Sequence, residues 1–350
     1  MAFYFRPAKQ IYLFFLTTVL LTACRHPKDA DVSNIDVKVT IERFDKDLDA
    51  MRTHNREQVA DQLIKKYGPF YRDFIERIIQ VGSLRDTGYL STLGEVLHNQ
   101  PYNDVEHEVD SVYPNLDKQN EQLTDAFKHI KYYFPKKALP KVYAYISGFA
   151  IQTPLGDGYV AVSLDMFLGA NSKFYNAAAI REVSPKYVSR RFAPEYIVPR
   201  VVETMAKEDM FPETPQDDKT MLSRMVYAGK ILYFMDKVMP NIPDTLKIGY
   251  TGKQLKWCQD FKPEIWGYFL EQNLLFETDY DKYQKYVGEA PFTPGFGENN
   301  DSAPRLAVWT GWQIVKEYMA KHPEITLQQL MADKDWQKIF NQSRYRPKDK

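Results

Sequence analysis

The sequence has 350 residues, of which 44% are hydrophobic and 26% are charged, which argues for an ordered globular protein and against a disordered one. The 46 lysine and arginine residues balance the 46 aspartate and glutamate residues, which argues against a general nucleic-acid-binding protein. Only two cysteines are present, which excludes a fold held together by disulfides. A chain of this length can bury the core of one large domain or of two modest ones.

The first 24 residues have the three parts of a bacterial signal peptide. Arg6 and Lys9 supply positive charge, and an apolar run of 11 residues follows from Ile11 to Leu21. This run is too short to cross a bilayer, which takes roughly 20 residues. Thr22 and Ala23 then lead into Cys24, and small residues before a cysteine at this place resemble a lipobox. The resemblance implies cleavage before the cysteine and attachment of diacylglyceryl and palmitate groups to it.

The alternative is an ordinary secretory signal with a chance cysteine. Removal of residues 1–23 takes away two basic residues and no acidic one, which leaves a mature chain with a net charge of −2. Residues 24–36 are polar, and we expect them to form a tether. Position 25 is arginine, so no aspartate next to the lipid indicates retention in the inner membrane. We expect a lipid-anchored protein of the cell envelope, in the outer membrane, with the periplasmic face and the cell surface both left open.

The predicted domain covers residues 37–350 and begins with a strand and a series of helices. Val37, Val39 and Ile41 alternate with polar residues, as in a short strand. Gly68-Pro69 interrupts the first helix, because proline lacks the N–H that a helix interior needs. Apolar residues at helical spacing predict these helices over residues 56–80, 90–97 and 121–134.

Two β-rich runs follow, Lys141–Ser147 and Tyr159–Asp165. The turn-prone residues 153–158 between them favour an antiparallel pair. A loop over residues 286–303 is rich in glycine, proline and asparagine. No composition shift divides the chain, so we predict a single, mainly helical α+β domain with a small central antiparallel sheet. The helices that return after Pro194 are predicted over residues 195–208, 217–238, 254–277, 304–320 and 327–342.

Motifs that carry chemistry are sparse. His107-Glu108 begins like the zinc-protease signature, but Ser111 stands at the second histidine position, and no other histidine pair has metal-binding helical spacing. Neither a Gly-x-Ser-x-Gly elbow nor a phosphate-binding loop occurs. Cys258, next to Trp257, is expected to be a small buried apolar group. We therefore expect no metal, no cofactor and no nucleic-acid partner.

A series of segments in a fixed order follows the lipobox. They are Ile41-Glu-Arg-Phe-Asp-Lys-Asp-Leu48, Tyr67-Gly-Pro-Phe-Tyr71, Val162-Ser-Leu-Asp-Met-Phe-Leu-Gly169, Tyr196-Ile-Val-Pro-Arg200, Tyr227-Ala-Gly-Lys230, Pro304-Arg-Leu-Ala-Val-Trp-Thr-Gly-Trp-Gln-Ile-Val315 and Ser343-Arg-Tyr345. The ordered set resembles the GldB family of gliding-motility lipoproteins of Bacteroidota over nearly the whole mature chain. No single segment is decisive, and the order makes the resemblance specific.

The same order is similar, more faintly, to a family of zinc peptidases in which a strand pair precedes a His-Glu-x-x-His helix. When Val202-Glu-Thr-Met-Ala206 is laid on that motif, Glu203 matches the general base, while Val202 and Ala206 stand where the two histidine ligands should be. Tyr227-Ala-Gly-Lys230 stands where a metal-binding glutamate is expected. Catalytic zinc needs three protein donors, and valine and alanine donate nothing. The resemblance thus implies a zincin-like scaffold, whereas the residues at the ligand positions argue against zinc binding and peptidase catalysis.

The family resemblance implies a membrane-anchored lipoprotein that supports gliding motility or associated envelope machinery. Its partners are then the membrane, through the lipid on Cys24, and a cell-envelope protein. We expect non-catalytic protein or peptide binding in a cleft between the central sheet, the Glu203 helix and residues 286–303. Arg305 and Trp309 are candidates for the cleft edge, with core packing and helix capping as their alternative roles. A cell-envelope hydrolase with a carboxylate pair that spacing does not reveal, and a scaffold without a cleft, remain alternatives.

Overall fold

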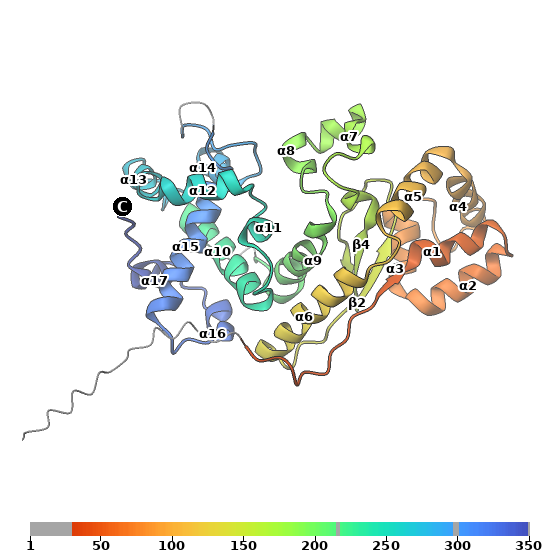
Figure 1. The fold of residues 1–350 in the computed structure, drawn as a ribbon, viewed down its shortest axis with the longest axis horizontal. Helices are drawn as coiled ribbons and strands as arrows, with labels where there is room; N and C mark the ends of the chain where they lie inside the picture. The colour runs from red at the N-terminus through yellow and green to blue at the C-terminus, as the bar shows by residue number, and fades with distance from the viewer. Residues whose placement is uncertain (1–29, 215–217, 297–300, 349–350) are drawn as a thin grey trace, which may run out of the picture. The chain divides into compact units, whose positions relative to one another are not determined.

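The structure, a computed structural model, describes residues 30–214, 218–296 and 301–348. The predicted leader, Cys24 and the first part of the predicted tether lie outside the described residues. Residues 31–350 form one compact unit. The described part of this unit is mainly helical and contains a small four-stranded sheet (Figure 1). The predicted helix-rich α+β class is therefore confirmed.

The elements before the sheet include the predicted strand and helices, together with two further α-helices over residues 44–48 and 100–112. β1 (Ile41–Arg43) covers the end of the predicted strand. The first long helix ends at Gly68, whose φ of 54° few other residues adopt, and Pro69 starts the next one. The acidic stretch around His107 forms one of these further helices. The helices are α1 (Phe44–Leu48), α2 (Arg56–Tyr67), α3 (Pro69–Asp73), α4 (Tyr89–His98), α5 (Gln100–Val112) and α6 (Asp117–Tyr133).

The sheet is mixed, so the predicted antiparallel sheet is wrong. β1 pairs with β2 (Lys141–Tyr145), and β2 pairs with β4 (Tyr159–Ser163), both in parallel. The reason is an additional short strand, β3 (Leu155–Gly156), which pairs with β4 antiparallel. The turn-prone residues do form a hairpin, with Asp157-Gly158 as its two-residue loop and a φ of 75° at Gly158, but it joins β3 to β4. β4 consequently enters the sheet in the direction of β2.

The N-terminal helices cover one face of this sheet with aromatic rings. Successive residues of a strand point to opposite faces, which places Tyr143, Tyr145 and Tyr159 together. The ring of Phe70 lies at centroid distances of 5.2 Å from Tyr143, 5.5 Å from Tyr145 and 5.1 Å from Tyr159. Edge-on and tilted contacts of this kind are the favourable geometry for aromatic pairs. We call this cluster the aromatic core; its members are Phe44, Tyr67, Phe70, Phe74, Tyr143, Tyr145 and Tyr159.

The opposite face carries aliphatic side chains, Val142 and Ala144 from β2 and Val160 and Val162 from β4. They belong to a larger core that extends over α6, α9 (Ile197–Met205), α10 (Met221–Val238) and α15 (Leu306–Lys321). Both predicted strands therefore alternate between an aromatic and an aliphatic face.

Two glycines allow α10 and α15 to cross at close range. A Cβ added to Gly311 of α15 would collide with the carbonyl oxygen of Met225, and one added to Gly229 of α10 would collide with the backbone of Gly311. The two backbones therefore touch where no other residue type leaves room. This contact is the most extensive one between helices of the described residues, and α10 and α15 lie side by side in Figure 1.

The C-terminal helices follow the predicted ones, with more breaks. The helix predicted over residues 254–277 is two helices, because Pro263 starts the second one, and the helix predicted over 327–342 restarts at Asp335, whose carboxylate accepts a bond from the backbone N–H of Lys338. None of the helices among the described residues is both long and apolar enough to cross a bilayer. The remaining helices are α7 (Ala178–Val183), α8 (Lys186–Ser189), α11 (Asp244–Ile248), α12 (Gly252–Asp260), α13 (Lys262–Glu271), α14 (Tyr280–Val287), α16 (Leu327–Ala332) and α17 (Trp336–Ser343).

Candidate functional site

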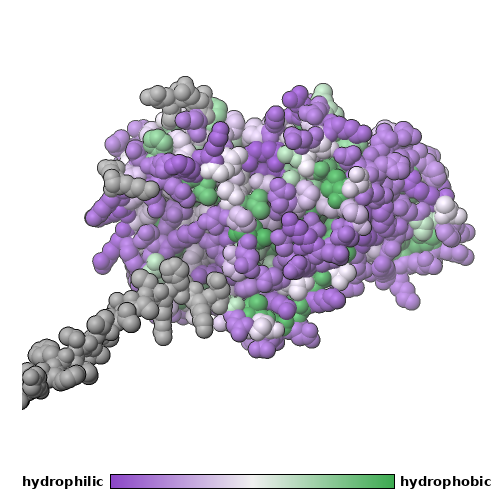
Figure 2. All heavy atoms as spheres, in the orientation of Figure 1, coloured by the Kyte–Doolittle hydropathy of each residue, from purple (hydrophilic) through white to green (hydrophobic). Residues whose placement is uncertain are grey.

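A cavity of about 650 Å³ lies among α9, α10, α11 and the first turn of α15. The sequence predicts a cleft between the central sheet, the Glu203 helix and residues 286–303. The Glu203 helix does line the cavity, Val287 contributes from that loop, and Arg305 contributes from just beyond it. The described strands do not line it, because their aliphatic face is already covered by core residues; α10 and α11 form that wall instead. Seen as spheres, this side of the molecule is mostly hydrophilic, with small hydrophobic patches (Figure 2).

The carboxyl ends of the parallel strands, where many sheet proteins bind ligands, are filled from within. Asp165 is fully buried there and accepts hydrogen bonds from the backbone N–H groups of Ser147 (3.1 Å) and Phe149 (2.7 Å) and from the hydroxyl of Ser163. Burial raises the pKa of Asp165, although these donors oppose the shift. The carboxyl group therefore ties the ends of the two parallel strands together.

α9 presents an apolar face to the core and a charged face to the cavity. Val201 and Met205 are fully buried, whereas Arg200, Glu203 and Lys207 line the cavity. Residues three and four apart lie on one side of a helix, so these three charges form a row. Lys207 belongs to a turn of π-helix over Ala206–Met210 that continues α9. The spacing in the sequence thus sets the spacing of charges in the wall.

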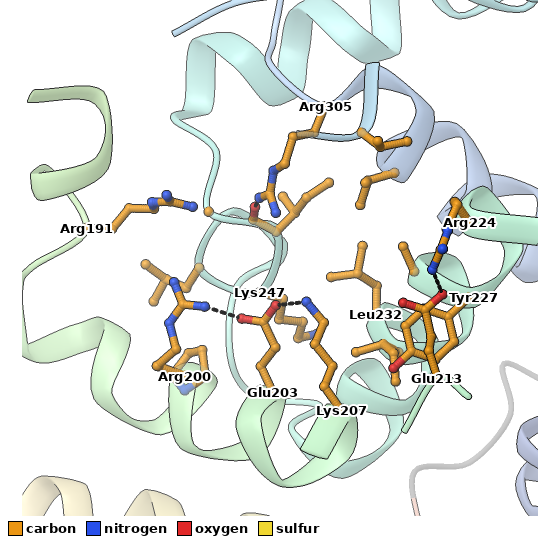
Figure 3. Close-up of a pocket in the computed structure, with 18 of the residues that line it drawn as sticks. Arg191, Arg200, Glu203, Lys207, Glu213, Arg224, Tyr227, Leu232, Lys247 and Arg305 are labelled. Atoms are coloured by element: carbon orange, nitrogen blue, oxygen red, sulfur yellow. Dashed lines mark hydrogen bonds and ion pairs between the residues drawn. The ribbon is translucent and has the colours of Figure 1, made fainter. Parts of the chain in front are cut away.

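Glu203 is held between two cations (Figure 3). Its Oε2 lies 2.8 Å from Nη1 of Arg200, and its Oε1 lies 2.6 Å from Nζ of Lys207. Burial on its own raises the pKa of this carboxyl, but the charges of Lys207, Arg200 and Arg305 outweigh it and hold the pKa well below the ordinary value. Glu203 is therefore ionised at neutral pH and is a weak proton acceptor.

Two further arginines reach the cavity from the side opposite Lys207 (Figure 3). The Nη1 and Nη2 atoms of Arg191 lie 3.0 Å from the two carboxylate oxygens of Glu289, and Nη1 of Arg305 lies 3.2 Å from Oε1 of the same group. The guanidinium of Arg305 also donates to the carbonyl oxygen of Ile248. Burial raises the pKa of Glu289, and Arg305 and Arg191 lower it by more. We call Arg191 and Arg305, together with the carboxylate of Glu289 that they hold, the arginine fork.

The other charged residues around the cavity are closer to charge balance. Arg224 of α10 pairs with Glu213, and Lys247 of α11 lies 2.9 Å from Asp236 and 3.4 Å from Asp244. Apolar side chains fill the wall between the two ends, from Pro199, Ile231, Leu232, Leu246 and Val308. The cavity therefore combines an apolar middle with a strongly basic end.

The residues predicted from the peptidase-like motif separate in the structure. Glu203 lines the cavity, but Val202 and Ala206 are fully buried in the core, on the other side of α9. Histidines at those two positions would thus lie in the core and not beside Glu203. Of the two candidates for the cleft edge, Arg305 lines the cavity, whereas Trp309 is only 1% exposed and packs in the core; Val308 lines the wall beside it.

The remaining predicted positions have structural surroundings. Tyr227 lines the cavity, but Lys230 is buried and donates to the carbonyl oxygens of Met331 (3.0 Å) and Asp333 (2.8 Å). Cys258 is buried as predicted, and burial raises the pKa of its thiol, which makes it unreactive. Across the described residues, no three histidine, cysteine, aspartate or glutamate side chains come together in a way that could hold a metal.

Sequence reasoning did not find Arg191, Arg200, Lys207 or Glu289. These residues come from separate segments of the chain and converge only through the fold. The adjacent pair Arg190-Arg191 is the one local signal, since two neighbouring arginines outside a predicted element suggest that something anionic holds them.

Comparisons with known proteins give one match. A family model described as gliding motility protein GldB matches residues 25–347. No curated protein and no solved structure matches the chain.

Proposed function

Because the chain belongs to the GldB family of gliding motility proteins, we propose that it is a lipid-anchored envelope protein that supports motility by binding a polypeptide segment of an envelope partner. The segment binds in the cavity among α9, α10 and α11, and binding is non-catalytic. The volume of about 650 Å³ suits a few amino-acid side chains. Tyrosine and arginine are the residue types that most often dominate binding surfaces, and both line this cavity.

The state of Glu203 is the observation that carries the proposal. A general base needs a pKa near the working pH and a free direction toward its substrate. Glu203 has a pKa held well below its ordinary range, and both of its oxygens are engaged by Arg200 and Lys207. Such a carboxylate shapes the charge of a wall and accepts protons poorly, which supports binding over hydrolysis.

Replacement of Glu203 tests the non-catalytic role. In a strain that lacks the gene, the full-length E203Q variant should restore spreading on agar to a large part of the wild-type extent, because the wall keeps its shape. Loss of a general base costs about 100-fold or more in rate, so an enzyme would lose nearly all function. The matched control is R77Q, since Arg77 is 77% exposed, pairs with Asp73 and is not among the residues that line the cavity. Complete loss of spreading by E203Q at normal protein levels would contradict the proposal.

The anchor is supported by the leader pattern, which ends at Cys24. Cells that express the full chain should incorporate labelled palmitate into the protein and carry it in the membrane fraction. The C24A variant should lose both the label and the membrane association. Equal labelling of the two proteins would rule out this cysteine as the attachment point.

A second candidate function is an envelope hydrolase with a carboxylate-based site. A pair of acidic side chains elsewhere in the fold favours it. Asp49 and Glu106 line a shallow surface hollow, and Arg52 lies 3.4 Å from Asp49 and 2.7 Å from Glu106. Burial, with the neighbouring Asp49, raises the pKa of Glu106 to about 7. A carboxyl group with that pKa can exchange protons at neutral pH. Hydrolysis of envelope glycans or peptides that E106Q abolishes and E203Q preserves would favour this candidate.

A further inference from the structure

The arginine fork is already occupied by a carboxylate of the chain itself. Arg191 meets Glu289 through two parallel contacts of 3.0 Å, and Arg305 adds a third at 3.2 Å. Two parallel N–H bonds to both oxygens are the geometry by which a guanidinium recognises a carboxylate. Glu289 is also 42% exposed, so its side chain can leave the fork for solvent. The internal contact therefore shows which group the fork fits.

This end of the cavity has more positive charge than its own acids neutralise. Arg191, Arg200, Lys207 and Arg305 supply four positive charges, and Glu203 and Glu289 supply two negative ones. The Nε atoms of Arg191 and Arg305 are buried and have no hydrogen-bond partner. The Arg191 side chain is only 8% exposed and points toward the cavity (Figure 3). The excess of two positive charges at this end suits the wall to a further anion.

The backbone around the fork is shaped for the two guanidiniums. Arg305 has a φ of 52°, a left-handed conformation that costs a residue with a side chain on the order of 1 kcal/mol or more. Gly249 has a φ of 76°, and a Cβ there would lie 3.0 Å from Nη1 of Arg191 and 3.6 Å from Nη2 of Arg305. Strain at one arginine and a glycine beneath both are features of a built site.

We propose that the arginine fork binds a carboxylate of the partner, an acidic side chain or a free chain end, and that Glu289 is its internal competitor. This inference rests on the proposed function, since it names the chemistry of the segment that enters the cavity. The neighbouring side chains of Ile248, Val287 and Val308 offer apolar contacts to the residue beside that carboxylate. The ligand class is therefore a short polypeptide segment with an acidic group next to apolar residues.

The probe for the test is the acetylated tripeptide Leu-Leu-Glu with a free carboxyl end. Its matched control is acetylated Leu-Leu-Gln amide, which has the same shape and no charge. Titration calorimetry of the full detergent-extracted chain should show binding of the acidic probe and at least about tenfold weaker binding of the amide, since the amide cannot form charged hydrogen bonds with the arginines. Inorganic phosphate is titrated separately.

Variants separate the fork from the rest of the protein. R191Q and R305Q should weaken binding of the acidic probe about tenfold or more, and R77Q should leave it unchanged. E289Q should strengthen it about threefold or more, because the competitor loses its charge while the arginines remain. A gain of affinity cannot arise from misfolding, so E289Q keeps the test valid even if an arginine variant is unstable.

The outcomes decide between the two proposals. Four results would each overturn the carboxylate inference. The first two are equal binding of the acidic probe and the amide, and equal binding of phosphate at the fork. The others are unchanged or weaker binding of the acidic probe by E289Q, and no binding of that probe even to E289Q at millimolar concentration. Partner binding is tested apart, by a photoreactive residue at position 232 in cells, with position 261 as the exposed control. If position 232 gives a specific crosslink but the calorimetry overturns the carboxylate inference, the proposed function alone is supported. If the fork binds the acidic probe as expected but no such crosslink forms, the carboxylate inference alone is supported.

Discussion

The aromatic core and the arginine fork differ in the kind of contact that holds their side chains. In the aromatic core, Phe44, Phe70 and Phe74 are at most 1% exposed, and their contacts are with other rings. In the fork, buried donors remain without partners and one residue has a left-handed backbone. The first region packs ring against ring, whereas the second gathers positive charges around one exposed carboxylate. The difference separates a region that stabilises the fold from the region that we propose binds a ligand.

The largest effect is expected in the aromatic core. F70A removes a ring that contacts both the helices and the sheet, and such a loss costs about 3–5 kcal/mol of unfolding free energy. Urea unfolding followed by circular dichroism measures this. The fraction that remains folded should bind the acidic probe with wild-type affinity. A large change in affinity would show that the two regions are coupled.

A somewhat smaller effect is expected at the α10–α15 crossing. G311A places a methyl group against the carbonyl oxygen of Met225, and the helices must move apart at a cost of about 3 kcal/mol. Because both helices also line the cavity, this variant should lose stability and affinity together. G267A is the control, since a Cβ at Gly267 meets nothing within 4 Å. Unchanged stability would mean that the crossing is not as close as described.

E203Q should lower the free energy of unfolding by about 1–2 kcal/mol at pH 7, because it leaves Arg200 and Lys207 without their carboxylate. We expect the lower value, since Lys207 is 42% exposed and solvent weakens the ion pair. The pKa of Glu203 is lowered on folding, so its contribution is present above the unfolded pKa near 4.5 and is lost as the pH falls below it. The gap between E203Q and wild type in urea unfolding should therefore shrink in acid. A gap that grows in acid would contradict the assigned pKa direction.

The smallest effect on stability is expected for R305G. Glycine relieves the left-handed backbone by about 1 kcal/mol, which offsets part of the lost contacts with Glu289 and Ile248. The melting temperature should change little, whereas affinity for the acidic probe should fall about tenfold or more. R305G therefore separates the effect on stability from the effect on binding more clearly than the other variants do. Loss of stability as large as that of F70A would place Arg305 with the structural residues.

The parts of the fold that depend on local chemistry could be predicted from the sequence. The break at Gly68-Pro69 and the long helices α10 and α15 follow from backbone and periodicity rules. The direction of β4 could not be predicted, because the two residues of β3 are too few to show alternation. The sequence indicated a turn within residues 153–158, but it did not indicate that β3 is the strand that this turn joins to β4.

The site was predictable only where one helix carries it. Glu203 was found because a motif falls on α9, and Arg305 because it lies in the family segment that begins at Pro304. The fork joins residues 191, 289 and 305, and the glycine beneath it is at position 249. Such contacts over long sequence separations depend on how α11 and α15 pack, which no local pattern contains.

The glycine contact between α10 and α15 has a consequence for the thermodynamics of binding. Tyr227, Ala228 and Leu232 of α10 and Val308 of α15 form one wall of the cavity, and the two backbones that carry them are locked against each other at Gly229 and Gly311. A ligand that enters meets a preorganised wall and loses little conformational entropy in ordering it. The main reorganisation on binding is then the release of one glutamate side chain into solvent.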